Sequence, residues 1–341
     1  MMNVRIIDKV GDLEALATDW HRLWLAQPRR EVFTLHAWAK VFLEVYGPGK
    51  GLCCLVAEDE GIKAILPLFR DAKGCLRFVG DPRSDYSDVL CLPADLDEVM
   101  PAFMKVLGGE RALSFSAVPE HSLLFTALKT MRHPFEIAIE EPCPAIEFDA
   151  EGAVVKELLK KESLRRHEKK VAKLGAIRLE RTTTQEATLK WLPVLFDQHI
   201  ARWKTTPTPS LFETEAHRRF YEQLVVNDTL WPMVDFRLVY AGDRVVATHF
   251  GFFHDQRFIW YKPSFDPELS NLGPGEVLLK YLIAAASDEG AREFDFTRGG
   301  EGFKQRFATV TRNNHVISRR PLLQRIRSAA GRVRRMLLKQ S

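Results

Sequence analysis

Four charged side chains are clustered around a glycine-rich turn in the last third of the sequence. The segment DFTRGGEGFK, residues 295–304, carries Asp295, Arg298, Glu301 and Lys304. It joins the end of a strand-like run to the start of a helical pattern, and charged residues in such a place commonly line a crevice. In that interpretation Asp295 and Glu301 bind an acceptor, and Arg298 or Lys304 lies near phosphate or carboxylate groups. The alternative is a salt-bridge cluster that neutralises itself.

Two side chains suited to proton transfer lie on neighbouring strand-like runs. His249 stands in VATHFGFF, where alternation places it on one face with Ala247 and Gly251. An imidazole titrates near neutral pH, so His249 is a candidate base or substrate ligand. The alternative is a core histidine whose nitrogens are satisfied. Tyr261 ends the next run and is a candidate general acid, with a plain strand aromatic as its alternative.

Two further groups are candidates for binding a substrate. His199 and Trp203 are four residues apart, so they share one face of a predicted helix and line either an acceptor pocket or the core. Asp85, Tyr86 and Asp88 follow the strands of the first half and form either part of the acceptor pocket or a surface turn. The sequence contains no HExxH, GxSxG, P-loop or CxxC pattern, so we expect no metal.

The elements that must position these residues occur in the same order twice. In each half, two helical patterns precede three strand-like runs joined by short turns. We therefore predict an α/β protein made of two tandem copies of one unit, with mixed sheets flanked by helices. The predicted domains are residues 1–150, residues 151–318 and a basic tail at 319–341.

A charged helical pattern at residues 154–180 connects the two copies, and Gly175 is a good helix stop. Its many Lys and Arg residues form either a solvated helix face or a basic wall for an anionic substrate or cofactor.

A second feature of the last third is Gly273-Pro274-Gly275, which directly precedes a helical run that ends at Gly290. A helix N-terminus presents unpaired N–H groups, and glycines there let a pyrophosphate approach closely. Pro274 also suits the first position of a helix. A simple loop-to-helix turn is the alternative.

This loop after three strands resembles that of the GNAT acyltransferase superfamily, whose pattern [RQ]xxGxG/A holds the pyrophosphate of coenzyme A. Both glycines fit, whereas Ser270 stands where the family has Arg or Gln. The resemblance implies a thioester between the strands RFIWYK and EFDFT, with Tyr261 as acid toward the leaving thiolate. It implies coenzyme A contacts at Ser270, Asn271, Leu272, Gly273, Pro274 and Gly275. The first copy has no such glycines, so its residues Asp85 and Tyr86 are expected to shape the acceptor pocket.

Several longer segments resemble the CelD-like acetyltransferases of cellulose and exopolysaccharide biosynthesis. They are SDYSD, ESLRRHEKKVAKLG, HIARW, FDPELSNLGPGEVLL and FDFTRGGEGFKQRF, in that order. That family is related to the Fem-type peptidoglycan aminoacyl transferases, which carry tandem GNAT-like domains. The resemblance implies transfer of an acyl group, acetyl above all, from acyl-CoA to an amine or hydroxyl of a small molecule or saccharide. The alternatives are a Fem-like transferase that uses aminoacyl-tRNA and a non-catalytic scaffold.

Charge and composition constrain the partners and the compartment. The net charge is +4, and residues 319–341 carry eight Lys or Arg and no acid, so the rest of the chain has a net charge of −4. We therefore expect no nucleic-acid partner. The tail either attaches to an anionic membrane surface as an amphipathic helix, packs on the protein or is disordered. Five cysteines without metal spacing, no secretory signal and no transmembrane run predict a cytoplasmic protein, peripheral at the inner membrane face if the tail binds there.

Overall fold

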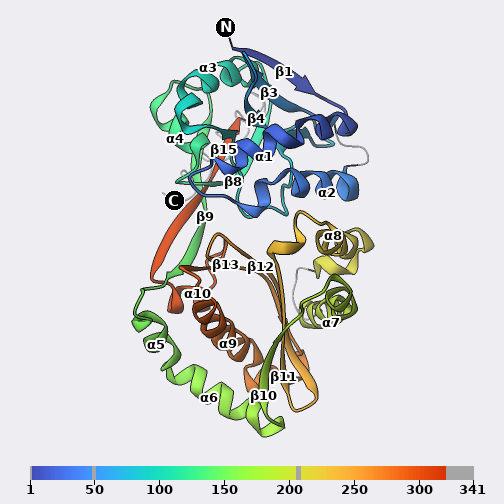
Figure 1. Ribbon diagram of the computed structural model, residues 1–341, viewed down its shortest axis with the longest axis vertical. Coiled ribbons are helices and arrows are strands. Elements are labelled where there is room, and N and C mark those ends of the chain that lie inside the picture. Colours follow the sequence, from blue (N-terminus) through green and yellow to red (C-terminus); the bar gives the residue numbers. More distant parts are fainter. Residues whose placement is uncertain (1, 48–50, 205–208, 320–341) are drawn as a thin grey trace, which may run out of the picture. The chain divides into compact units, whose positions relative to one another are not determined.

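The computed structural model describes residues 2–47, 51–204 and 209–319, so all of the basic tail except Arg319 lies outside the described residues. The chain forms two compact units, shown in Figure 1. Unit 1 comprises residues 1–43, 47–141 and 313–341, and unit 2 comprises residues 44–46 and 142–312. The sequence predicts domain boundaries after residues 150 and 318, whereas the compact units divide at residues 141/142 and 312/313.

The described residues of unit 1 form two small groups of paired strands and four α-helices. One sheet has the order β1-β3-β4-β7, and the other group has the order β15-β8-β6-β5-β2. Its strands are β1 (Asn3–Ile7), β2 (Gly51–Leu52), β3 (Cys54–Glu58), β4 (Ile62–Leu66), β5 (Leu68–Arg70), β6 (Leu76–Phe78), β7 (Leu90–Cys91) and β8 (Leu113–Pro119). Its helices are α1 (Ala17–Leu25), α2 (His36–Tyr46), α3 (Leu96–Leu107) and α4 (Leu123–Thr130).

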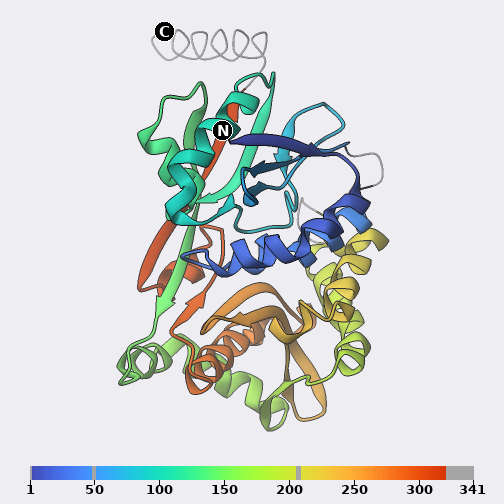
Figure 2. The same ribbon diagram turned by 45° about the horizontal axis from the view of Figure 1, so that its top comes forward.

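Unit 2 is a twisted sheet with helices on both faces. The strand order is β10-β11-β12-β13-β14-β9, from β10 (Ile177–Arg181), β11 (Val234–Ala241), β12 (Arg244–His254), β13 (Arg257–Phe265), β14 (Glu293–Asp295) and β9 (Glu136–Glu147). Helix α9 (Pro274–Asp288) covers one face, with α5 (Ala153–Leu159) and α6 (Glu162–Val171) packed against it. Helices α7 (Gln185–Trp203) and α8 (Glu215–Val226) lie on the other face, as Figures 1 and 2 show. The short helix α10 (Gly302–Phe307) follows β14.

The predicted repeat is present, because each unit runs through two helices, an antiparallel set of strands, a long helix, a strand and a short helix in the same order. The last strand of each copy was not predicted. Strand β9 leaves the first copy and its residues Ala145–Glu147 pair with β14 of unit 2. Strand β15 (Val310–Arg319) leaves the second copy and pairs with β8 of unit 1. Each sheet is therefore completed by a strand from the other half of the sequence.

Helix α9 illustrates how the sequence specifies an element of unit 2. Pro274 occupies its first position, where a missing N–H does no harm, and Gly290 follows its end with a left-handed φ of 81°. Its apolar residues recur every three or four positions and are all buried against β12 and β13: Val277, Leu278, Leu279, Leu282, Ile283 and Ala286. This packing fixes the start of α9 relative to the strands that carry the candidate site.

A buried ion pair lies on β11, on the sheet of unit 2. The Arg237 guanidinium donates to both oxygens of Asp235, at 2.7 and 2.8 Å, and to Glu289 Oε2 at 2.7 Å. Arg237 and Asp235 are 2% and 0% exposed. Although burial alone would lower it, the contacts with the two carboxylates raise the pKa of Arg237. Arg181 Nε also pairs with Asp235 Oδ2 at 3.1 Å, from a side chain that is 41% exposed. Removal of Arg237 therefore leaves the buried carboxylate with one solvent-exposed cation.

We expect Arg237→Met to lower the free energy of unfolding by about 3–5 kcal/mol, because it strips a hydrogen-bonded cation from the buried Asp235 carboxylate. Urea unfolding followed by circular dichroism measures this. The double variant Arg237→Met/Asp235→Asn is the control, and it should recover much of the loss. A single variant that loses less than about 1 kcal/mol would show that Arg181 alone compensates the Asp235 carboxylate.

Candidate active site

The centre of the candidate site is the place where β13 leaves β14. The two strands are parallel partners only over Arg257–Ile259 and Glu293–Asp295. Directly after this pairing β13 contains an extra residue, because Phe250 faces Lys262 while Phe252 faces Ile259 across the ladder. Such a bulge bends a strand and re-aims its side chains. Strand β13 therefore has a backbone edge beyond Ile259 that β14 does not cover.

His249 supports this bulge from within the core. Its Nε2 accepts a hydrogen bond from the Tyr261 backbone N–H at 3.3 Å, and its ring stacks on Phe258 and Trp260. The side chain is 0% exposed, and burial lowers the pKa of His249 well below its usual range. A Cβ on Gly251 would overlap both His249 and the Ile259 carbonyl oxygen. These contacts favour a structural role for His249 over the base interpretation. The core interpretation holds for Nε2 only, because the buried Nδ1 has no hydrogen-bond partner among the described residues.

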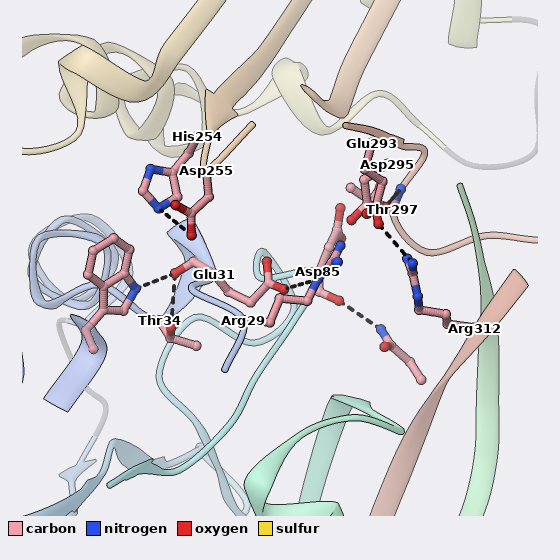
Figure 3. A network of polar contacts seen from close by, with 12 residues as sticks. Arg29, Glu31, Thr34, Asp85, His254, Asp255, Glu293, Asp295, Thr297 and Arg312 are labelled. Atoms are coloured by element: carbon pink, nitrogen blue, oxygen red, sulfur yellow. Dashed lines mark hydrogen bonds and ion pairs between the residues drawn. The ribbon is translucent and has the colours of Figure 1, made fainter. Parts of the chain in front are cut away.

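Asp295 and Thr297 stand where β14 ends. Asp295 is 1% exposed, and its Oδ1 accepts from the Thr297 backbone N–H at 2.8 Å. Thr297 has a left-handed φ of 55°, and its hydroxyl donates to the Trp260 carbonyl oxygen at 3.2 Å. Figure 3 shows the two side chains beside each other. The strained turn thus holds a buried carboxylate against the bulge of β13.

The glycine-rich turn after Thr297 encloses one ammonium group. Lys304 is 4% exposed, and its Nζ donates to the Arg298 carbonyl oxygen at 2.8 Å and pairs with Glu301 at 3.0 Å. Gly299 has a φ of 127°, and a Cβ there would meet both Lys304 and Glu301. Two of the four predicted charges are therefore brought together as an ion pair, and Asp295 lies separately at the strand end.

His199 and Trp203 are stacked on each other in α7, with ring centroids 5.3 Å apart. The Nδ1 atom of His199 contacts Ser210 Oγ at 2.7 Å. Burial, with smaller contributions from Lys262 and Arg202, lowers the pKa of His199 to about 4. His199 therefore acts as a neutral group near two cations.

The two cations near His199, which are Arg202 and Lys262, were missed by the sequence analysis. The Arg202 guanidinium lies 4.6 Å from the centre of the Phe265 ring, and Lys262 Nζ lies 4.0 Å from the centre of the Tyr261 ring. Tyr261 itself is 4% exposed and stacks on Tyr221 at 6.0 Å. Helical spacing from His199 and the position next to Tyr261 were the signals that could have revealed them.

The SDYSD segment of unit 1 is buried, so its interpretation as a surface turn is wrong. Asp85 and Tyr86 are 5% and 4% exposed. The Asp85 carbonyl oxygen accepts from Asn314 Nδ2 at 2.8 Å. Burial raises the pKa of Asp88 to about 7, although its carboxylate accepts three backbone N–H bonds, two of them from the start of α4. Asp88 thus caps a helix.

The loop that the resemblance assigns to coenzyme A adopts part of the expected geometry. Gly273 has a left-handed φ of 77°, and Pro274 begins α9. Residues Pro267–Leu272, which include Ser270, Asn271 and Leu272, form a 3-10 turn that ends at Gly273. The Gly273 N–H donates to the Ser270 carbonyl oxygen at 3.2 Å. The prediction of a glycine-shaped helix entrance is confirmed as a backbone feature.

The space at this entrance is filled by the chain itself. A Cβ on Gly273 would lie 2.5 Å from the ring of His167, a residue of α6. Glu276 stands in the first turn of α9, where its carboxylate contacts His167 Nδ1 at 3.1 Å and Arg306 at 2.7 Å. Although burial alone would raise it, the contacts with Arg306, Ser163 and His167 lower the pKa of Glu276. An internal anion therefore already neutralises the positive end of the helix.

The backbone donors of this turn are also largely used. Pro274 has no N–H, and the N–H groups of Glu276 and Val277 donate to the Gly273 carbonyl oxygen at 3.1 and 3.3 Å. A pyrophosphate needs several converging donors and no competing carboxylate. The residues present do not fit a pyrophosphate in the position that the resemblance implies.

The described residues contain neither a metal-binding cluster nor a membrane-spanning helix. Within residues 2–47, 51–204 and 209–319, no group of three His, Cys, Asp or Glu side chains could hold a metal ion. No helix in the same ranges is long and apolar enough to cross a membrane.

Comparison with known proteins identifies the fold. Residues 160–305 match a family model described as an acetyltransferase (GNAT) domain. No curated protein sequence is significantly similar to the chain. Residues 160–305, which lie in unit 2, are therefore similar to a GNAT-type acetyltransferase domain.

Three solved structures extend the likeness to both units. FemX is 10% identical with a TM-score of 0.58, covering 88% of this chain and 95% of its own. The C-terminal domain of a putative lysylphosphatidylglycerol synthetase from Agrobacterium fabrum is 11% identical with a TM-score of 0.60, covering 95% and 97%. A tandem GNAT protein from the clavulanic acid biosynthesis pathway is 11% identical with a TM-score of 0.52, covering 93% and 98%. At these identities the likeness shows the fold alone, a tandem GNAT arrangement.

We expect the free energy of unfolding to fall as the pH is lowered from about 6.5 to about 4, in part through His199. The unfolded chain protonates this histidine near pH 6.5, whereas the folded chain does so only near pH 4, so acid favours the unfolded state. Urea unfolding at pH 7, 6 and 5 should show a shallower pH dependence for His199→Gln than for the wild type. His21→Gln, at an exposed histidine, is the control. Equal slopes for His199→Gln and the wild type would contradict the assignment.

Proposed function

We propose that this chain is an acyltransferase and that unit 2 moves an activated acyl group onto an amine or hydroxyl beside the parting of β13 and β14. The observation that carries the proposal is the buried carboxylate of Asp295 at the end of β14, at the last residue that pairs with β13. A backbone edge can align an extended acyl carrier, and holding the acceptor in line accounts for much of the rate in such reactions.

The residues around this edge can share the chemical steps. Asp295, held by the Thr297 N–H, accepts the proton of the attacking amine or hydroxyl, directly or through a water. Tyr261 protonates the leaving group, because a phenol next to the Lys262 ammonium can give up its proton. His249 serves the fold in this proposal, since its Nε2 holds the bulge.

The acyl donor that the geometry favours is an aminoacyl ester of tRNA, as in a Fem-like transferase. The supporting observation is the entrance of α9, where the His167 ring packs against Gly273 and the Glu276 carboxylate would compete with a coenzyme A pyrophosphate. The sequence resemblance to relatives of the Fem-type transferases supports the same donor. The acceptor is then an amine or hydroxyl of a small molecule or saccharide.

Acyl-CoA is the second candidate donor, because one specific observation favours it. Gly273 has the left-handed conformation and Pro274 the first helical position, and residues 160–305 match a domain described as an acetyltransferase. In this version the chain transfers an acetyl group to a saccharide during exopolysaccharide or cellulose synthesis, at the inner face of the membrane if the basic tail binds lipid.

The variant Gly275→Asp separates the two donors. A Cβ at Gly275 would lie 3.2 Å from Phe265, so Gly275→Ala is the matched control for bulk without charge. If aminoacyl-tRNA is the donor, we expect the rate of aminoacyl transfer to differ less than about twofold between the two variants. We also expect calorimetry to detect no heat of binding with acetyl-CoA. The contrary result is that Gly275→Asp binds acetyl-CoA at least about tenfold more weakly than Gly275→Ala, a difference of roughly 1.4 kcal/mol. That result would identify acyl-CoA as the donor in place of aminoacyl-tRNA.

We expect Asp295→Asn to lower kcat on the order of 100-fold, since a general base contributes about that much or more. The asparagine side chain keeps an oxygen for the Thr297 N–H, so the fold is retained and KM should change little. Single-turnover acyl transfer measures the effect, with the melting temperature as a check of folding. A variant that keeps more than half of the wild-type turnover would exclude Asp295 as the base.

A further inference from the structure

Helix α6 presents a strongly basic outer face. Arg165, Arg166, Lys169 and Lys173 are all exposed, and they recur at helical spacing along α6 and the turn that follows it. No side-chain hydrogen bond or ion pair to another described residue is found for these four. The one acid on the same face is Glu162, in the first turn. We call these four cations the α6 basic face.

The opposite face of α6 is fixed to α9. Leu164 and Val171 are buried in the core of unit 2, and Glu168 pairs with Lys280 of α9 at 2.5 Å. Lys170 donates to the Asn271 carbonyl oxygen at 3.3 Å, in the turn before Gly273. The α6 basic face is therefore held rigidly beside the start of α9, as the parallel course of the two helices in Figure 1 illustrates.

The arrangement of these cations suits an extended polyanion. From Arg165 to Lys173 the helix advances about 12 Å at 1.5 Å per residue. Side chains that diverge along such a length cannot converge on one compact phosphate, but each can meet a different phosphate of a nucleic-acid backbone. A membrane surface would also require several apolar side chains that insert. Beside these cations, the described part of α6 and the turn after it exposes one large apolar side chain, that of Leu174 at 42%.

We propose that the α6 basic face binds the phosphate backbone of RNA, and that it holds the tRNA body of the acyl donor while the acyl end reaches the edge of β13. The identification of the RNA as tRNA rests on the proposed function. The new element is the surface that binds the RNA, which the overall charge of the chain does not reveal.

The test measures binding of unfractionated, deacylated tRNA to the full-length chain between 50 and 200 mM salt. We compare the wild type with Arg165→Ala/Lys169→Ala and with the variant that replaces all four cations by alanine. Each lost phosphate contact should make the slope of log K against log salt shallower by about one, and the fourfold variant should bind at least about tenfold more weakly. Lys190→Ala/Arg219→Ala is the matched control, because both residues are exposed cations of unit 2 on other helices.

Two outcomes would contradict the proposal that the α6 basic face binds RNA. One is an unchanged salt slope in the fourfold variant, with circular dichroism showing that it is folded. The other is loss of binding to vesicles of anionic phosphatidylglycerol without loss of tRNA binding, which would make the face a membrane contact. Aminoacyl transfer is scored separately. If RNA binding depends on α6 but no aminoacyl transfer occurs, the RNA-binding surface is supported and the proposed function is rejected. If transfer occurs and the fourfold variant has an unchanged KM for tRNA, the proposed function is supported and the RNA-binding surface is rejected.

Discussion

The hydrogen bond from the Tyr261 N–H to His249 is the contact on which the candidate site depends. A bulge in a central strand leaves a backbone donor without a ladder partner, and a buried donor without a partner is costly. His249 supplies the acceptor from the neighbouring strand, and the missing side chain of Gly251 leaves room for its ring. With this donor satisfied, β13 can turn away from β14 after Ile259. The open edge beside Asp295 is therefore a consequence of a histidine that takes no proton itself.

The two ends of helix α9 carry partial charges of opposite sign because of the helix macrodipole, and the protein compensates each end differently. At its start, Glu276 in the first turn meets the positive end and is itself held by Arg306 and His167. At its other end, Glu289 would face the negative end unfavourably, but it pairs with the buried Arg237 at 2.7 Å. Because both termini are neutralised by the protein, α9 is stable without a bound anion. This is the physical reason why the glycine-shaped entrance does not by itself indicate a phosphate site.

Local patterns predicted the elements and their repeat, but not the contacts between distant segments. Periodicity located the strands around His249 and the helix after Gly273 because both depend on neighbours in sequence. The exchange of β9 and β15 between the halves depends on pairing between strands far apart in sequence, such as Asn314 of β15 opposite Pro119 of β8, and periodicity carries no such information. His167 reaches Glu276 over 109 residues, so the filling of the glycine loop was equally invisible. The sequence resemblance identified the tandem GNAT fold because the order of its motifs is a property of the whole chain.

The net charge of the chain does not indicate how charge is distributed over its surface. Outside the basic tail the net charge is −4, and on that basis we expected no nucleic-acid partner. Yet residues 156–173 contain eight Lys or Arg and three Glu, and the fold turns four of these cations outward on one helix. Phosphate contacts act over about one Debye length, roughly 8–10 Å at physiological salt, so a polyanion responds to the local face and not to the distant carboxylates that balance it. The arrangement in space, more than composition, therefore determines whether this chain can hold an anionic partner.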